Sequence, residues 1–328
     1  MEFDKNLSWI RRLEDIMKPK FSSLLLVLGL LFAALPAYAD AVEDCISKDP
    51  ERKISGCNEI ITTKSLRGKP ISSKKLAIVY RSRGDAYGIK GQLNRAIQDY
   101  DKAIELNPKY AIAHIKRGDA YRKKGQLNRA IQEYDKAIEL NPKLAITHIK
   151  RGAAYRKRGQ LNRAIQDFHK AIELNPQFAL AHFNRGNAYR KKGQLNRAIQ
   201  DYDKAIKLNP KYADAYNNRG VAYSDKGQVN RATHDLNMAI ELNPKSAATY
   251  YNRGIAYRKK GELNRAIQDL YGAARLSAYW AKRFQKSLKN HGFYNGEIDG
   301  KFGTEIRAAL KACLKTRKCN LYKPHRIG

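Results

Sequence analysis

Histidine and cysteine are the side chains of this protein best suited to metal binding or nucleophilic chemistry, with seven and four copies respectively. His114, His148 and His182 recur every 34 residues, which is the period of a repeat in the surrounding sequence. A histidine that recurs with a repeat is expected to pack rather than to bind a metal. The sequence also has no nucleophile elbow, no His-Glu-x-x-His motif and no phosphate-binding loop. We therefore expect no catalytic residue, no metal site, no cofactor and no enzymatic activity.

The N-terminal segment has the layout of a secretory signal peptide. A basic stretch at 17–20 precedes a twelve-residue apolar run at 24–35, and the sequence Ala-Tyr-Ala then offers small residues to signal peptidase. We expect cleavage before Asp40, so that residues 1–39 are the signal, with its core at 17–39. A membrane anchor is the alternative, but the run is shorter than the ~18 apolar residues that a span needs. The mature protein is expected to be periplasmic or secreted, with no stable membrane span.

The four cysteines form two local pairs, Cys45 with Cys57 and Cys313 with Cys319. An even number of cysteines in an exported chain indicates disulfides, and the local pairings are the simplest of three possible connectivities. Buried free thiols are an alternative. A zinc site is disfavoured, because neither pair has CxxC spacing or a nearby pair of histidines.

The net charge of +33 indicates an anionic partner. Acidic proteins, acidic polymers, an anionic membrane surface and nucleic acid would all satisfy the charge alone. Export argues against nucleic acid, which we do not expect as a partner. Acidic or extended protein segments, anionic polymers of the cell envelope and an anionic membrane surface remain.

A block of 34 residues repeats along most of the chain. Such a period is typical of stacked units that bury apolar surface only against their neighbours. Apolar residues at helical spacing predict two helices in each block. The first is expected to end at a recurring glycine, and the second to run from near Asn94 to Leu-Asn-Pro, with the proline opening the next helix. The block at 111–144 has near-copies that start at Ala77, Ala145, Ala179, Ala213 and Ala247.

This pattern resembles the tetratricopeptide repeat. Small residues stand at positions 8, 20 and 27 of the blocks, aromatic residues at position 11 and in most blocks at 24, and proline at 32. The resemblance covers residues 77–280 and implies an all-α fold, a right-handed superhelical solenoid of six repeats. The sixth repeat has Ala278 in place of the proline, so its second helix is expected to run on into the following residues.

Residues 40–76 are expected to cap the N-terminal end of the array. The segment 51–61 aligns with 94–104 as a degenerate half repeat, in which Cys57 takes the place of a core tyrosine. Terminal repeats are normally atypical because one face meets water. Cys45 would lie on a preceding short helix, so a disulfide to Cys57 would staple this cap.

The first helix of most repeats is basic, whereas the second is mixed in charge. In tetratricopeptide-repeat proteins the first helices line a concave groove, and positions 5, 9, 12 and 13 usually face the ligand. The resemblance implies an apolar strip flanked by cations, which would suit an acidic segment with hydrophobic anchors. The same cations also lie near helix C-termini, where they are favourable without a ligand. The implied groove residues are Ile115, Arg122, Lys123, Ile149, Arg156, Lys157, Phe183, Asn187, Arg190, Lys191, Tyr251, Arg258 and Lys259.

A separate set of arginines recurs at position 7 of every repeat. We expect these side chains to be structural and to bond between repeats. They are Arg83, Arg117, Arg151, Arg185, Arg219 and Arg253.

The period stops after Ser277, and a short module follows. A Phe-Gln-x-x-Leu-x-x-x-Gly sequence begins at Phe284, and Ile-Asp-Gly-x-Phe-Gly and Arg-Ala-Ala come after it. This pattern resembles the peptidoglycan-binding domain type 1, over residues 281–319, with a basic tail at 320–328. Two departures from the family are Ile306 at a usual threonine position and Cys313 in place of an aromatic residue. The peptidoglycan-binding candidates are Tyr294, Asp299, Phe302 and Arg307.

These module residues also have a purely structural interpretation. The aromatic side chains would be the core of a tiny domain, and Asp299 before a glycine would be a turn residue. A calcium loop that starts at Asn295 is disfavoured, because its twelfth position is Ile306 and not glutamate.

The sequence as a whole favours an exported, non-enzymatic scaffold. Its basic groove would bind protein partners, and its C-terminal module would dock on peptidoglycan. A diffuse binder of anionic envelope polysaccharide, or a periplasmic chaperone or assembly factor, is the alternative.

Overall fold

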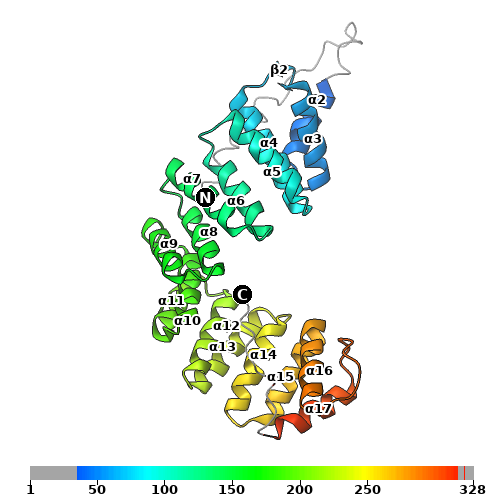
Figure 1. The fold of residues 1–328 in the computed structure, drawn as a ribbon. Helices are drawn as coiled ribbons and strands as arrows, with labels where there is room; N and C mark the ends of the chain where they lie inside the picture. The colour runs from blue at the N-terminus through cyan, green and yellow to red at the C-terminus, as the bar shows by residue number, and fades with distance from the viewer. Residues whose placement is uncertain (1–34, 317–320, 322–328) are drawn as a thin grey trace, which may run out of the picture.

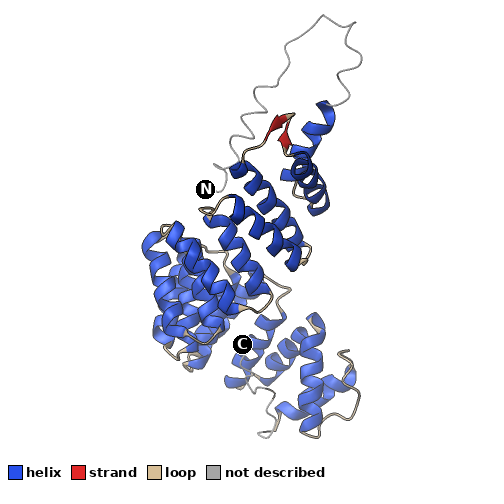
Figure 2. Cartoon of the chain, turned by 45° about the horizontal axis from the view of Figure 1, so that its top comes forward, coloured by secondary structure: helices blue, strands red, loops and turns tan. Residues whose placement is uncertain are grey.

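The computed structural model describes residues 35–316 together with Leu321. The expected all-α fold is confirmed: the described residues form a superhelical array of helices with a single short hairpin (Figures 1 and 2). Most of the predicted signal peptide and most of the basic tail lie outside these residues. The elements are α2 (Leu35–Ile46), α3 (Pro50–Thr63), β1 (Ser65–Leu66), β2 (Lys69–Pro70), α4 (Ser73–Ile89), α5 (Leu93–Leu106), α6 (Ala111–Lys123), α7 (Leu127–Leu140), α8 (Ala145–Lys157), α9 (Leu161–Leu174), α10 (Ala179–Lys191), α11 (Leu195–Leu208), α12 (Ala213–Asp225), α13 (Val229–Leu242), α14 (Ala247–Lys259), α15 (Leu263–Leu276), α16 (Ala278–Asn290) and α17 (Thr304–Leu314).

Each repeat is a pair of antiparallel helices, from α4 with α5 to α14 with α15. The recurring glycine ends the first helix as predicted: Gly125 has a φ of +76°, and Gln126 N donates to Tyr121 O across the turn. The second helix begins at Leu127, one residue earlier than the predicted asparagine cap. Gln126 precedes the helix and makes no side-chain capping bond. Asn128, the residue expected as the cap, already lies within the helix.

The proline of each repeat does not open the next helix, and this expectation was wrong. Pro108 lies in a turn in which Tyr110 N donates to Asn107 O, and α6 begins only at Ala111. Asn107 is extended, with φ −145° and ψ 85°, because a residue before proline avoids the helical region. The proline therefore ends one helix and sets the turn to the next.

Close approach of the two helices in a repeat depends on the small residue at position 8. A Cβ atom placed on Gly152 of α8 would lie 2.7 Å from Cε1 of Phe168 on α9. Phe168 is fully buried at this contact. The same contact between a glycine and an aromatic ring recurs in Gly118 with Tyr134. The period of the sequence therefore predicts which residues form the core of these repeats.

The N-terminal end is closed by α2, α3 and the hairpin. A disulfide joins Cys45 on α2 to Cys57 on α3, with their Cα atoms 4.6 Å apart, and Ser82 of α4 donates to the carbonyl of Cys45 at 3.0 Å. Ala41 and Val42 are buried beside these cysteines. The predicted cleavage before Asp40 falls inside α2 and leaves this packed part of the helix in place.

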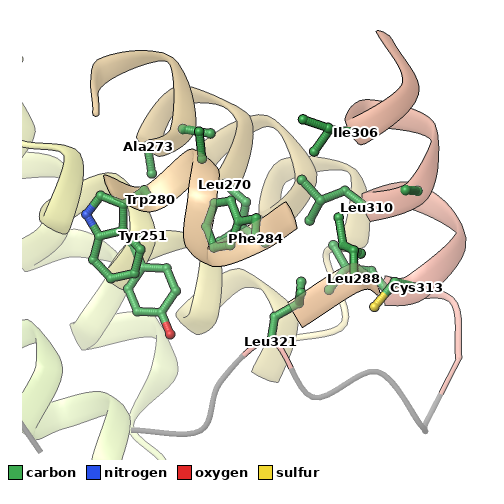
Figure 3. Close-up of a cluster of buried hydrophobic side chains, with 14 residues drawn as sticks. Tyr251, Leu270, Ala273, Trp280, Phe284, Leu288, Ile306, Leu310, Cys313 and Leu321 are labelled. Carbon is green, nitrogen blue, oxygen red and sulfur yellow. The ribbon is translucent and has the colours of Figure 1, made fainter. Parts of the chain in front are cut away.

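The C-terminal end is closed by α16 and α17, which share one core with repeat six (Figure 3). Trp280 of α16 stacks on Tyr251 of α14, with ring centroids 4.0 Å apart. The expectation that α15 would run on was wrong, because Ser277 is extended at φ −154° and starts a new helix. Cys313 is buried and disulfide-bonded, while Cys319, its predicted partner, lies outside the described residues.

Within the described part of the chain, every helix is too short or too polar to cross a lipid bilayer.

Candidate functional site

The first helices of successive repeats lie side by side and form one continuous face. α6 contacts both α4 and α8, and such contacts continue through α10, α12 and α14. Figure 1 shows the array as an arc, with α8 and α12 toward its open side and α9 and α11 on its outer side. We call the surface formed by positions 5, 6, 9, 12 and 13 of the six repeats, such as Lys116, Asp119 and Arg122, the inner face.

The apolar residues predicted for the groove are largely buried. Ile115 and Ile149 are 6 % and 3 % exposed and belong to the cores between helices. Tyr251 is 8 % exposed because it stacks on Trp280. Phe183 is half-buried against neighbouring tyrosines. These four side chains present little apolar surface to a ligand, so recognition at the inner face would depend mainly on charge and hydrogen bonds.

The predicted basic residues differ in what they contact. Lys123 donates to the carbonyl of Gly88 at 3.3 Å, and Lys259 donates to that of Ser224 at 2.8 Å. Both carbonyls lie near the C-terminus of the preceding repeat's first helix, where a cation is favourable without any ligand. Lys157 and Lys191 are exposed, and Arg122, Arg156, Arg190 and Arg258 are half-buried.

Two aspartates at position 9 compensate the cations of the first repeats. Asp85 lies 2.8 Å from Arg81 of the same helix and 3.3 Å from Lys116 of the next repeat. Asp119 accepts a hydrogen bond from Lys150 of the next repeat at 2.7 Å. Each aspartate therefore links two repeats on the inner face. Sequence reasoning placed position 9 in the groove but did not predict that its carboxylates pair across repeats, although their spacing of one repeat was visible.

A chain of side-chain amides crosses repeats four to six. Asn252 Nδ2 donates to Asn217 Oδ1, Asn217 Nδ2 to Asn218 Oδ1, and Asn218 Nδ2 to Asn187 Oδ1, at 2.9, 2.9 and 2.7 Å. The Tyr202 hydroxyl also donates to Asn187 Oδ1, at 2.8 Å. Only Asn187 was singled out from the sequence. The signal for Asn218 and Asn252 is the recurrence of asparagine at position 6 of the last three repeats, whereas Asn217 is at position 5 of repeat five alone.

Arg156 and Arg190 lie between these two regions, at position 12 of repeats three and four. The Nε atom of each is buried and has no hydrogen-bond partner within the described residues. Burial lowers the pKa of the Arg156 guanidinium, and the nearby charge of Arg190 lowers it further. Arg190 also interacts with the Tyr202 hydroxyl. The two arginines therefore concentrate positive charge at the middle of the inner face.

The arginines at position 7 are structural and bond between repeats, as predicted. Arg151 on α8 donates Nε and Nη2 to Asp167 on α9 at 2.9 and 2.6 Å. Its Nη1 donates to Asp135 on α7, in the preceding repeat, at 2.7 Å. Arg219 joins α11, α12 and α13 in the same way.

The recurring histidines pack between helices, as their period predicts. His148 is 5 % exposed, with Nε2 3.3 Å from the carbonyl of Pro142 and Nδ1 3.5 Å from Asp167. His114 contacts Glu133 at 2.9 Å. Across residues 35–316, no three histidine, cysteine or acidic side chains are grouped so that they could hold a metal ion.

In the C-terminal module, the fully buried Gln285 organises the loop before α17. Its Nε2 donates to Asp299 Oδ1 at 2.7 Å, and its Oε1 accepts from Gly300 N at 2.8 Å. The hydrogen bond from Gln285 and one from Lys301 N hold the pKa of Asp299 below its ordinary value. Asp299 therefore has the turn role that the structural interpretation predicts.

The other module candidates also make contacts within the chain. Tyr294 donates its hydroxyl to the carbonyl of Glu297 at 3.0 Å, and the half-buried Phe302 packs edge-on against Tyr271 of α15. Arg307 is exposed, with its guanidinium carbon 5.3 Å from the centre of the Tyr271 ring. Of the four candidates, Asp299 and Arg307 are the more accessible to a ligand.

Models of known protein families match the repeats of this chain. A model described as "TPR repeat" matches residues 84–121, 118–157, 152–190 and 186–227, and two described as "Tetratricopeptide repeat" match 213–246 and 236–268. Together these matches span more than half of the chain. This chain is a tetratricopeptide-repeat protein. The matched residues end before the C-terminal module. No curated protein matches the sequence.

Solved structures similar to this tetratricopeptide-repeat protein include MamA, at 30 % identity and a TM-score of 0.46, covering 50 % of this chain and 96 % of MamA. YrrB, described as a TPR protein with an unusual peptide-binding site, is 26 % identical, with a TM-score of 0.44 and coverages of 54 % and 92 %. Pseudomonas aeruginosa pilF is 17 % identical, with a TM-score of 0.56 and coverages of 62 % and 93 %. The likeness to pilF shows the fold alone.

A tetratricopeptide-repeat array is a scaffold suited to protein–protein interaction, and such arrays are generally non-enzymatic. Its extended inner face gives many side chains access to one partner.

Proposed function

We propose that this protein is an exported scaffold whose inner face binds acidic, extended segments of partner proteins. The observation that carries the proposal is the charge of that face. Lys53 of α3 and six cations at positions 5, 6, 9 and 12 of repeats one to four stand against two carboxylates at those positions, Asp85 and Asp119. This leaves a net positive surface that a partner's carboxylates would neutralise. The seven cations are Lys53, Arg81, Lys116, Arg122, Lys150, Arg156 and Arg190.

The environment of Lys53 supports the inclusion of the N-terminal cap in this surface. Burial lowers the pKa of this α3 lysine, the Asp85 carboxylate partly offsets burial, and the charges of Arg81 and Lys116 lower the pKa further. One carboxylate thus serves three cations at this end of the inner face. A carboxylate from a partner would relieve their mutual repulsion.

Export is part of the proposal. The Cys45–Cys57 disulfide lies directly after the predicted cleavage site, and Cys313 is disulfide-bonded at the other end of the array. Disulfides at both ends suit an oxidising compartment, where thiol-reducing systems are absent. We therefore place the working protein in a bacterial periplasm or outside the cell.

Binding should be tested with the mature chain, residues 40–328, by fluorescence anisotropy. The probe is a labelled hexaglutamate peptide, with hexaglutamine as the uncharged control and polygalacturonate as a competing anionic polysaccharide. The proposal expects hexaglutamate to bind, hexaglutamine to bind at least about tenfold more weakly, and polygalacturonate to compete poorly at equal charge concentration. Equal competition by the polysaccharide would instead support a diffuse binder of envelope polysaccharide. An absence of peptide binding would refute the proposal.

Docking on peptidoglycan through the C-terminal module is a second part of the proposal. Gln285 holds the loop against α16, and Asp299 in this loop is exposed, as is Arg307 on α17. Tyr294 and Phe302 lie at the two ends of the loop. Basic side chains there suit the carboxylates of peptide stems, and aromatic rings suit sugar faces. The module shares its core with repeat six, so docking would fix the end of the array to the cell wall.

Cell-wall docking should be tested by sedimenting the mature chain with purified peptidoglycan at low and high salt. Truncation after Leu276 would uncover the core residues Leu270 and Tyr251, so full-length variants are the cleaner comparison. Arg307→Gln is compared with Arg265→Gln, a loss of the same charge from the outer helix α15. Docking predicts that binding survives high salt and is weakened only by the change at Arg307. Sedimentation that salt abolishes, or that both variants reduce equally, would leave only diffuse charge attraction.

A further inference from the structure

We propose that Arg156 and Arg190 form the carboxylate-recognition point of the inner face, and that they bind an acidic side chain of an extended partner polypeptide. This inference rests on the proposed function, since it assigns the partner's carboxylate to a particular place on the face. Repeats three and four supply the two guanidinium groups from adjacent helices, α8 and α10.

The first argument is the loss of the compensating acid in these two repeats. In repeat two, Asp119 stands at position 9 on α6, and Arg122 at position 12 lies 3.9 Å from its carboxylate. Position 9 is Ala153 in repeat three and Asn187 in repeat four, while position 12 remains arginine in both. The acid is therefore missing in two adjacent repeats whose position-12 arginines lie on the contacting helices α8 and α10.

The second argument is that the Nε atoms of the two guanidinium groups lack acceptors within the described part of the chain, while Arg190 also interacts with the Tyr202 hydroxyl. Asn187 Oδ1 occupies the place of the carboxylate but already accepts from Tyr202 and Asn218. Lys150, at position 6 of repeat three, donates instead to Asp119 in repeat two. The buried Nε atoms of Arg156 and Arg190 thus have no partner among the described residues. A buried donor without an acceptor is unfavourable, and a ligand carboxylate would remove that penalty.

The third argument concerns the shape of the ligand. The amide chain from Asn187 through Asn218 and Asn217 to Asn252 continues along the inner face from the two arginines. Asn218, Asn217 and Asn252 each use one of their two Nδ2 hydrogens in the chain, whereas Asn187 takes part only through Oδ1. The remaining donor and acceptor positions of this row of amides match the alternating carbonyl and N–H groups of an extended main chain. We therefore place the acidic side chain at repeats three and four and the following main chain over repeats four to six.

The test uses the mature full-length protein and the labelled hexaglutamate probe at one fixed ionic strength. The double variant Arg156→Gln with Arg190→Gln removes the recognition point. Its matched control, Arg163→Gln with Arg197→Gln, removes the same two charges from the same two repeats, at side chains that stack on Tyr155 and Tyr189. We expect the first variant to bind hexaglutamate about 10- to 100-fold more weakly and the control to bind within about twofold of the unmodified protein.

A second variant, Ala153→Asp with Asn187→Asp, keeps both arginines and installs the carboxylates found in the first two repeats. We expect it to lose hexaglutamate binding to a similar extent and to unfold at a higher temperature, because the arginines then have internal partners. Because this variant should be more stable than the unmodified protein, its loss of hexaglutamate binding could not be explained by unfolding.

Two results would overturn the inference. If the unmodified protein binds hexaglutamate but the change at Arg156 and Arg190 weakens binding no more than its control, the recognition point lies elsewhere and the proposed function stands. The same holds if the Ala153→Asp, Asn187→Asp protein still binds hexaglutamate as tightly as the unmodified chain. Failure of the unmodified protein to bind would instead overturn the proposed function as well.

Discussion

Arg151 and Asp167 form a two-point ion pair between α8 and α9, and the third nitrogen of the same guanidinium bonds Asp135 of the preceding repeat. Asp167 is 5 % exposed, whereas the Asp135 side chain is 41 % exposed. One arginine thus joins three helices through one buried and one exposed carboxylate. Because this arrangement recurs along the array, it is a principal link between successive repeats.

Removal of the buried carboxylate should be far more damaging than removal of the exposed one. Asp167→Ala leaves the Arg151 charge half-buried without its two-point partner, and we expect it to lower the free energy of unfolding by about 3 kcal/mol. Asp135→Ala should lower it by less than about 1 kcal/mol, because water replaces the lost partner. Urea unfolding followed by circular dichroism gives both values. Equal losses in the two variants would show that the exposed contact matters as much as the buried one.

Repeat two has a glutamate, Glu133, where other repeats have aspartate, and its ionisation should stabilise the fold. Burial raises the pKa of Glu133, but hydrogen bonds from His114 and Arg117 together outweigh burial, so the pKa lies below its ordinary value. A carboxyl group whose pKa is lowered on folding stabilises the folded state above its unfolded pKa. That contribution is lost as the pH falls through the folded pKa.

The comparison is between the unmodified protein and Glu133→Gln, by urea unfolding between about pH 6 and pH 3. We expect the unmodified protein to be the more stable at about pH 6 and the difference to shrink steadily below the unfolded pKa of about 4.5. A difference that stays constant or grows toward acid would contradict this assignment. The difference isolates Glu133, because all other carboxyl groups titrate in both proteins.

Two glycines of α4 should respond to alanine with opposite signs. A Cβ atom on Gly84 would meet Cε1 of Tyr100 at 2.7 Å, whereas one on Gly88 would lie 3.7 Å from the Tyr100 hydroxyl. Gly84→Ala overpacks the core of repeat one and should lower the free energy of unfolding by about 1–3 kcal/mol. Gly88→Ala should raise it by about 0.5–1 kcal/mol, because alanine restricts the unfolded chain and favours a helix. Thermal unfolding of both variants, measured side by side, decides whether both signs are correct.

The sequence predicts the parts of this fold that depend on its period. Every block has a glycine at the position of Gly152, and most blocks have an aromatic residue at the position of Phe168. The position-7 arginines recur with their carboxylates sixteen residues away, so both contacts follow from the repeat. The helix boundaries are less well predicted. Pro108 lies in a turn and not at a helix start, because the extended Asn107 decides where the helix ends.

The inner face could be predicted only in outline, because its chemistry depends on the residues in which the repeats differ. Ala153 and Asn187 replace an aspartate, and that departure was visible in the sequence. Which acceptors remain for Arg156 was not visible. It depends on Asn218 reaching across from the next repeat to occupy Asn187 Oδ1, and hence on the angle between neighbouring helices. Burial of Ile149 at an expected ligand position has the same origin.

The Cys45–Cys57 disulfide should stabilise the N-terminal cap and leave the middle of the array unchanged. A cross-link across a loop of this length contributes about 3 kcal/mol. Cys45→Ala with Cys57→Ala should therefore speed amide hydrogen exchange in α2 and α3, with little change in α10 and α11. The local effect follows because each repeat contacts only its neighbours.

The double variant is preferable to a reducing agent here, because Cys313 is also disulfide-bonded and a reductant would alter both ends. Exchange that accelerates uniformly from α2 to α15 would contradict the local effect. It would show that the whole array unfolds as one cooperative unit.

The stacking of Trp280 on Tyr251 predicts that α16 and α17 stabilise repeat six and do not fold as a separate unit. Trp280 is 8 % exposed and lies in one core with Leu270 of α15 and Leu310 of α17 (Figure 3). Trp280→Ala should lower the stability of this end of the array by about 3–5 kcal/mol. The neighbouring Tyr279 is 59 % exposed and packs edge-on against Trp280, so Tyr279→Ala tests that ring contact alone and should have a smaller effect of about 0.5–1.5 kcal/mol.

Hydrogen exchange distinguishes a shared core from an independent module. Because the ring fills space between repeat six and α16, its loss should speed exchange in α15 as well as in α16 and α17. An independent module would show faster exchange in α16 and α17 alone, with α15 still protected. In that case repeat six would be stable without a cap. Faster exchange in all three helices would show that repeat six and the module unfold together.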